Sequence, residues 1–154
     1  MRSATVVTRF ICGAAFLWAL GWGSPAHAQL GVGEWVRTDK EGGGMTMTVA
    51  ACCKGGYRLT YTLPIAQGKQ PPQVLTVDLP MDGTDVPVIS AGKPTGQTMS
   101  AKRVDDRHYT GVVKQDGKPY LTSNATLSAD GKTMTIEDTL AGSNQKVIET
   151  WMKK

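Results

Sequence analysis

The side chains best suited to chemistry in this chain are two adjacent cysteines, two closely spaced methionines and one histidine. Cys52 and Cys53 can form a disulfide with each other, remain as thiols, pair between chains or bind a soft metal ion. Met45 and Met47 place two thioethers on one strand face, and His108 adds an imidazole. Copper binding is therefore one interpretation. The favoured one is that the methionines fill a hydrophobic core, and no metal site is expected.

No arrangement typical of an enzyme is present in the sequence. A Gly-x-Ser-x-Gly nucleophile turn, a His-Glu-x-x-His zinc motif and a glycine-rich phosphate loop before a helix are all missing. Asp105 and Asp106 lie close to His108, but neighbouring strand residues face opposite sides, and an Asp-Asp-Arg turn is usually solvated. We therefore expect no catalytic residues and no cofactor.

Residues 1–28 have the three parts of a secretory signal peptide. Arg2 and Arg9 give a basic start, an apolar run follows over 10–22, and residues 23–28 end in Ala-His-Ala. The apolar run is shorter than the roughly 20 residues that a membrane-spanning helix needs. We expect cleavage before Gln29, export to the periplasm or the medium, and no membrane span after removal of the signal.

The remaining segment, 29–154, has the length of a single domain with one core. Arg2 and Arg9 fall in the signal peptide, so this segment carries 15 basic and 13 acidic residues. These charges neither cluster nor alternate with stacking aromatic residues, which argues against nucleic-acid binding. Its only cysteines are adjacent, so no disulfide can join distant strands. We expect a monomer.

Apolar and polar residues alternate along most of this segment with the period of two that is typical of β-strands. Met45, Met47 and Val49 share one face, while the threonines between them occupy the other. Helical periodicity is missing. Ten strands are expected, over 34–37, 45–49, 57–63, 74–79, 85–89, 98–104, 108–114, 120–127, 133–138 and 146–152.

Glycines that follow an aspartate mark the two clearest turns. Gly117 and Gly131 stand where a tight hairpin needs a positive φ, so both are expected to be structural. The stretches 64–73 and 90–97 contain prolines or glycines and lack a periodic apolar face. These two stretches are predicted to be loops.

A meander of about 8–10 short antiparallel strands has two exposed edges, and joining the first strand to the last removes both. The segment is therefore predicted to be all-β, an up-and-down meander closed into a barrel, with little or no helix. Barrels of about eight strands leave room for packed side chains or one small ligand, and about ten strands enclose a wider interior. This geometry is the reason to expect a pocket.

The first predicted strand carries Gly33-Glu34-Trp35, which resembles the Gly-x-Trp opening of lipocalins, fatty-acid-binding proteins and related calycin barrels. Gly33 and Trp35 are accordingly expected to be structural. The segments 82–88, 99–107 and 128–135 add to the similarity. Over most of 33–153 the chain resembles a group of small exported bacterial lipocalin-like proteins, which implies a lipocalin-like barrel.

Two features differ from the better-known barrels of this kind. Only nine residues separate Trp35 from Met45, too few for the helical lid of fatty-acid-binding proteins, and Trp151 falls in a strand rather than beside a C-terminal helix. The ligand of a relative therefore cannot be transferred to this chain. In such barrels a basic residue often packs over the first-strand tryptophan, and the candidates here are Arg103, Lys153 and Lys154.

We interpret the chain as an exported, non-catalytic barrel that binds a small, mostly apolar or amphipathic molecule. Inward-facing side chains are expected either to line the pocket or to pack together as core: Tyr57, Leu59, Tyr61, Leu75, Val77, Met99, Tyr109, Met134 and Trp151. Arg103 shares the face of Met99 and is the candidate partner for an anion, unless the strand end returns it to solvent. The first alternative is a protein-binding module or hydrolase inhibitor that uses its loops. Copper binding is the second.

Overall fold

The computed structural model describes residues 30–64, 71–143 and 145–154. The expected signal peptide, 1–28, lies outside the described residues, as do residues 65–70 of the predicted loop 64–73. Within the described ranges, no helix has the length and apolar character needed to cross a membrane. The strands are β1 (Gly33–Arg37), β2 (Thr46–Cys52), β3 (Gly56–Leu63), β4 (Gln73–Leu79), β5 (Val86–Ser90), β6 (Lys93–Arg103), β7 (His108–Gln115), β8 (Lys118–Leu127), β9 (Thr133–Leu140) and β10 (Lys146–Lys153).

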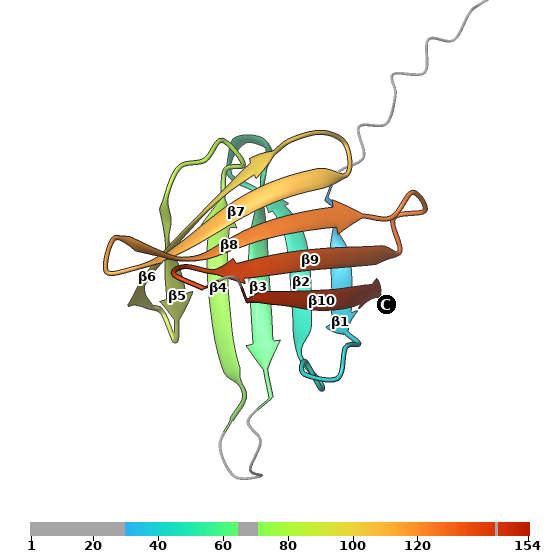
Figure 1. The fold of residues 1–154 in the computed structure, drawn as a ribbon, viewed down its shortest axis with the longest axis horizontal. Coiled ribbons are helices and arrows are strands. Elements are labelled where there is room, and N and C mark those ends of the chain that lie inside the picture. Colours follow the sequence, from blue (N-terminus) through green and yellow to red (C-terminus); the bar gives the residue numbers. More distant parts are fainter. Residues whose placement is uncertain (1–29, 65–70, 144) are drawn as a thin grey trace, which may run out of the picture.

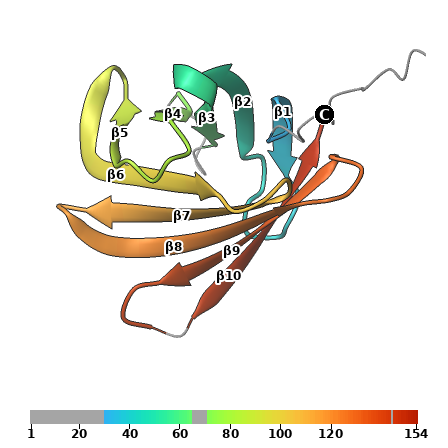
Figure 2. The same cartoon turned by 90° about the horizontal axis from the view of Figure 1, so that it is seen from above.

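The predicted all-β meander is confirmed, and it closes into a barrel. Each strand pairs antiparallel with its neighbours in sequence, and β1 pairs with both β2 and β10. Strands β1 to β4 run at a steep angle to strands β7 to β10 (Figure 1), and the two groups form layers on opposite sides of the interior (Figure 2). β6 curves from one layer to the other (Figure 2). Gly96 lies in this strand with a φ of 87°, a conformation that suits a bend at a barrel corner.

The side chains that point into the barrel form the hydrophobic core, because every second residue of each strand faces inward. The largest fully buried side chains are Trp35, Trp151, Met47, Leu79 and Val49. These residues come from four strands, β1, β10, β2 and β4, so the core joins the first strand to the last.

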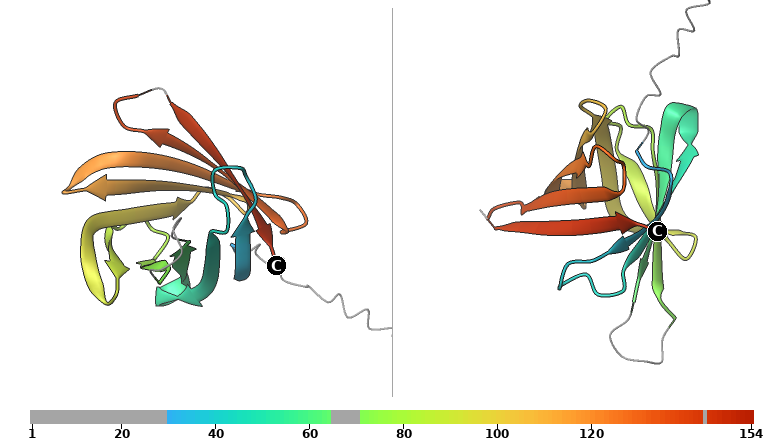
Figure 3. Two further views of the ribbon diagram at one scale, coloured as in Figure 1. Left: turned by 90° about the horizontal axis from the view of Figure 1, so that it is seen from below. Right: turned by 90° about the vertical axis from the view of Figure 1, so that its right-hand side faces the viewer.

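The seam between β1 and β10 closes the barrel. Trp35 pairs with Lys153 and Arg37 pairs with Trp151 across this seam, and the C-terminal end of β10 lies beside β1 (Figure 3). Of the three basic candidates named above, Lys153 packs over the ring of Trp35, with Nζ 5.9 Å from the ring centroid. The indole Nε1 of Trp35 donates a hydrogen bond of 2.8 Å to the carbonyl oxygen of Gly31.

The prediction of a loop over 90–97 is wrong. β5 and β6 form a tight hairpin whose two turn residues, Ala91 and Gly92, have positive φ values of 48° and 76°. Pro94 is tolerated within β6 because only β5 pairs with this part of the strand. The pairing of β6 with β7 begins later, at Gln97. Proline and glycine indicated the end of a strand, but β6 continues through them because this part of it pairs with β5 alone.

The turns at the aspartate–glycine pairs lie where they were predicted. Asp116 and Gly117 join β7 to β8 with φ values of 51° and 76°, and Gly131 has a φ of 68° between β8 and β9. Glycine adopts these values without steric strain. Gly33, at the start of β1, also has a positive φ, of 139°.

Candidate functional site

The barrel encloses a cavity of about 250 Å³ that is lined mainly by apolar side chains. Five methionines line it: Met45, Met47, Met81, Met99 and Met134. Methionine side chains are flexible and polarisable, so they adapt to ligands of different shape. The volume lies just below the usual range for ligand pockets, roughly 300–1,000 Å³. The cavity therefore has room for a small molecule.

The two ends of the cavity differ in packing. At one end Leu30 is buried inside the barrel, and its main-chain N–H donates a 3.1 Å hydrogen bond to the hydroxyl of Tyr57, which is buried as well. Leu79 and Leu127 are also buried at this end. The lining residues at the opposite end are only partly buried, and they include Tyr61 and Leu121. The cavity is therefore closed at the end of Leu30 and more open at the other, which we call the polar end because charged side chains gather there.

Arg37 organises the polar end. Its Nε lies 2.7 Å from Oδ2 of Asp39, and its Nη1 lies 2.6 Å from Oε1 of Glu149. The Arg37 side chain is only 8% exposed. Asp39 also accepts a hydrogen bond of 3.2 Å from the main-chain N–H of Thr150. The ion pairs thus tie the end of β1, the loop that follows it and β10 to one another.

The pKa values of the two acidic partners of Arg37 are shifted in opposite directions. The hydrogen bond from Arg37 is the main cause that lowers the pKa of Asp39 to about 2, so this carboxylate stays ionised over the physiological range. Burial raises the pKa of Glu149, although the hydrogen bond from Trp151 and the charge of Arg37 act in the opposite direction. The indole Nε1 of Trp151 donates that bond to Oε2 of Glu149 over 3.0 Å.

Asp138 is the second carboxylate that lines the cavity, and no cationic side chain of the described residues forms an ion pair with it. The hydroxyl of Ser123 donates a 2.5 Å hydrogen bond to Oδ1 of Asp138, from the directly opposed position on β8. Burial raises the pKa of Asp138, more than the Ser123 bond and the charge of Arg37 lower it. Tyr61 lines the same end of the cavity, and burial, with smaller contributions from Glu149 and Asp138, raises the pKa of its phenol. Its hydroxyl therefore remains protonated.

Five of the seven ligand-binding residues predicted from the sequence line the cavity, namely Tyr61, Leu75, Met99, Tyr109 and Trp151. Tyr57 is buried at the closed end but does not belong to the lining. Arg103 lies at the end of β6, outside the lining, where it donates to the carbonyl of Asp105 over 3.0 Å and to Oδ1 of Asp106 over 2.5 Å. The strand end thus returns Arg103 to a turn at the surface.

The charged residues of the polar end were missed by the sequence analysis, although a signal was present. Arg37 stands two residues after Trp35, Glu149 two residues before Trp151, and Asp138 two residues after Ile136. Each therefore shares the inward face of a strongly apolar neighbour. Counting alternate residues on each strand would have placed three charges in the interior. The register that brings them together required the structure.

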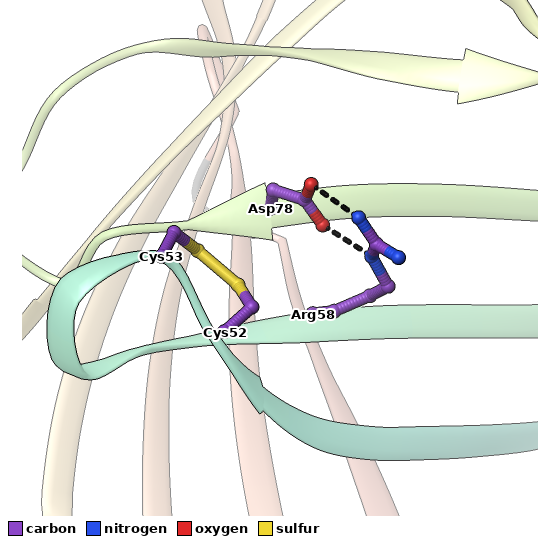
Figure 4. Close-up of a disulfide and its surroundings, with 4 residues drawn as sticks. All are labelled: Cys52, Cys53, Arg58 and Asp78. Carbon is purple, nitrogen blue, oxygen red and sulfur yellow. Dashed lines mark hydrogen bonds and ion pairs between the residues drawn. A yellow bond between two sulfur atoms is a disulfide. The ribbon is translucent and has the colours of Figure 1, made fainter.

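The cysteine pair lies away from the cavity. Cys52 and Cys53 form a disulfide where β2 meets the short 3-10 helix η1 (Cys53–Gly55), at the turn into β3 (Figure 4). Arg58 makes two hydrogen bonds, of 2.6 and 2.7 Å, to the carboxylate of Asp78 on β4. This ion pair is exposed, so solvent weakens its contribution to stability. Neither cysteine belongs to the cavity lining.

The structure does not assemble the soft donors considered for copper. Met45 and Met47 line the cavity, whereas His108 does not. The Nδ1 of His108 lies 2.7 Å from Oδ2 of Asp105 at the exposed turn between β6 and β7. In the described ranges, no three His, Cys, Asp or Glu side chains are grouped so as to hold a metal ion.

Comparisons with protein families, with curated proteins and with solved structures found no match for this chain. The barrel is consistent with a lipocalin-like fold, and the chemistry of its interior must be argued from its own residues.

Replacement of Gly42 by Ala tests how tightly Arg37 is held. A Cβ at this position would lie 1.9 Å from Cδ of Arg37 and 2.1 Å from its Nε, so the guanidinium must move away from its partners. We expect Gly42→Ala to lower the free energy of unfolding by about 1–3 kcal/mol, measured by urea denaturation. Gly43→Ala is the matched control, because nothing lies within 4 Å of its Cβ. Equal stability of the two variants would contradict this role for Arg37.

Replacement of Asp138 by Asn tests whether the carboxylate destabilises the fold. Because its pKa is raised by burial, the folded chain binds a proton more readily than the unfolded chain, and stability from this group falls as the pH rises through the raised pKa. We expect Asp138→Asn to raise the Tm at pH 7.5 by roughly 2–4 °C, which corresponds to about 1 kcal/mol. The gain should disappear below about pH 3.9, where an ordinary Asp is protonated in both states.

Glu137→Gln is the control for this measurement, because Glu137 is next in sequence and pairs with Lys146 in a partly exposed position. Thermal unfolding of both variants and of the unchanged chain would be followed from pH 7.5 to pH 3.5. An Asp138→Asn variant that is no more stable than the unchanged chain at pH 7.5 would show that burial of the ionised carboxylate does not destabilise the fold.

Proposed function

We propose that this chain is an exported, non-catalytic binding protein that holds one small, mostly apolar molecule inside its barrel. The observation that carries the proposal is the cavity of about 250 Å³, which apolar side chains line over most of its surface. A cavity of this kind with a few convergent polar groups is the usual form of a small-molecule site. The signal-like residues 1–28 support export.

The arrangement of the interior supports reversible binding and not chemical conversion. The cavity wall offers methionine and aromatic surface, while Asp138 and Glu149 are engaged by Ser123, Arg37 and Trp151. Such groups orient a bound molecule without supplying an activated nucleophile. The more open polar end provides the route of entry, because the closed end is occupied by Leu30.

Retention of a natural ligand is the first expected result. Native mass spectrometry of the protein purified from its own host should give a chain mass that begins at Gln29, together with an adduct of a small organic molecule. Release of the adduct under denaturing conditions would show that it is held by the fold. A chain that keeps residues 1–28 would refute export by cleavage, and a covalent adduct would refute reversible binding.

Filling the cavity tests the location of the site. Ala125 lines the cavity from β8, so Ala125→Phe places a ring where the ligand would lie. We expect 1-octanol to raise the Tm of the unchanged chain. The variant should bind 1-octanol at least about tenfold more weakly than the unchanged chain, measured by calorimetric titration. Ala50→Phe, on the outer face of β2 opposite Arg58, is the control and should bind 1-octanol as the unchanged chain does. Equal affinity of all three proteins would place binding outside the barrel.

A further inference from the structure

We infer that the ligand is an amphipathic amine whose protonated amino group binds at the polar end, between Asp138 and Glu149, while its apolar body fills the rest of the cavity. This inference rests on the proposed function and adds the charge of the ligand to it. It is carried by the placement of two carboxylates in an apolar cavity whose described lining contains no Lys, Arg or His side chain.

The register brings the two carboxylates close together on one wall. Asp138 on β9 pairs with Val147 on β10, and Glu149 stands two residues farther along β10, on the same inward face. Diagonal neighbours of this kind lie about 7–8 Å apart. That separation leaves room for one ammonium group to contact both carboxylates. Both side chains line the cavity.

Among the described residues, the charges at this end do not balance. Arg37 is shared between Asp39 and Glu149, and both partners lie within hydrogen-bond distance of it. Among the described residues, the close donor to Asp138 is the neutral hydroxyl of Ser123. Three carboxylates therefore face one guanidinium in a partly buried region, where an unpaired charge is expensive. A ligand that carries a positive charge would supply the missing partner.

Two aromatic rings at the polar end favour the same ligand charge. Tyr61 and Trp151 both line the cavity, and their ring centroids lie 6.2 Å apart in an edge-to-face arrangement. A cation near an aromatic face gains about 0.5–2 kcal/mol, more when water is excluded. The hydroxyl of Tyr61 forms no hydrogen bond to another described residue, so it is available to a polar group of the ligand. Burial raises the pKa of both carboxylates, although the charge of Arg37 acts in the opposite direction on each.

The same charges disfavour anionic ligands. A carboxylate ligand that entered with its head group at the polar end would face Asp138 and Glu149, and the described lining offers it no Lys, Arg or His side chain at either end. The described charges therefore disfavour a fatty acid. A neutral alcohol would bind through its apolar body alone.

Three probes with the same octyl body test the inference: octylamine, 1-octanol and octanoate. Their dissociation constants would be measured with the purified protein at pH 7.5 by calorimetric titration. Octylamine is protonated at this pH, as a lysine side chain is. We expect it to bind at least about tenfold more tightly than 1-octanol, and octanoate to bind more weakly than either.

Asp138→Asn and Glu137→Gln each remove one negative charge from β9, the first inside the cavity and the second outside it. The first variant should lose at least about tenfold in affinity for octylamine and keep its affinity for 1-octanol, whereas the second should change neither. A general effect of protein charge would weaken octylamine equally in both variants. That result would overturn the inference.

The unchanged protein provides a test that needs no variant. The titratable groups that face this site are Asp138, Glu149, Asp39, Arg37 and Tyr61. As the pH falls from 7.5 to 4.5, the two cavity carboxylates take up protons first because their pKa values are raised, so octylamine should bind progressively more weakly while 1-octanol does not change. Octylamine affinity that is independent of pH would contradict the inference.

The outcomes separate this inference from the proposed function. Tight and equal binding of octylamine and 1-octanol would leave the apolar site standing and overturn the choice of an amine. Preferred binding of octanoate would also overturn it and would point to an anchoring cation not seen in the lining. Failure of all three probes to bind would refute the proposed function, and the inference with it.

Discussion

The ion pairs of Arg37 are the interaction on which both the closure and the chemistry of this barrel depend. β1 has only five residues, and it must pair with β10 to remove the two edges of the sheet. Arg37 stands at the end of that short seam and holds Glu149 on β10 as well as Asp39 in the loop after β1. Removing one partner of a buried ion pair leaves a charge without compensation, which costs about 3–5 kcal/mol. The same guanidinium pairs with Glu149, which can therefore face an apolar cavity. Because this ion pair joins β1 to β10, the site depends on closure of the barrel.

The two ends of the cavity differ in how tightly their side chains are packed and in how polar they are. Side chains near Leu30 pack tightly and provide stability, whereas those near Asp138 are less buried and include most of the polar groups. The methionines connect these regions with side chains that adapt to what they contact. A carboxylate such as Asp138 is difficult to explain by stability, because burial opposes its ionised form. Residues that are retained against stability are concentrated in functional sites, and this one lies in the only part of the described lining where two acids meet.

Most of the fold could be predicted from the sequence, because period-two alternation is a local property. All ten strands were expected, most of them close to their observed positions, although β6 begins five residues earlier than predicted. The aspartate–glycine pairs located two turns. The loop predicted at 90–97 was wrong because Pro94 disrupts a strand only where its missing N–H is needed, and that depends on how many partners the strand has there. The ion pair of Arg37 with Glu149 joins residues separated by 112 positions. Strand faces could have indicated the inward charges, which were missed, but not which of them would meet.

The contrast between Arg37 and Arg103 shows why an inward-facing arginine does not by itself indicate an anionic ligand. Arg103 was expected to bind an anion because of its strand face, yet it lies at a strand end, where Asp105 and Asp106 accept its hydrogen bonds. Arg37 does enter the barrel, but carboxylates occupy its hydrogen-bonding nitrogens on two sides. What a ligand meets is the charge left after the protein has paired its own groups. Among the described residues of the polar end that remainder is negative, since Asp138 has a neutral donor where Glu149 has a cation. The barrel fold therefore does not determine the charge of the ligand. That charge is determined by a few interior residues that remain unpaired after the ion pairs within the protein are taken into account.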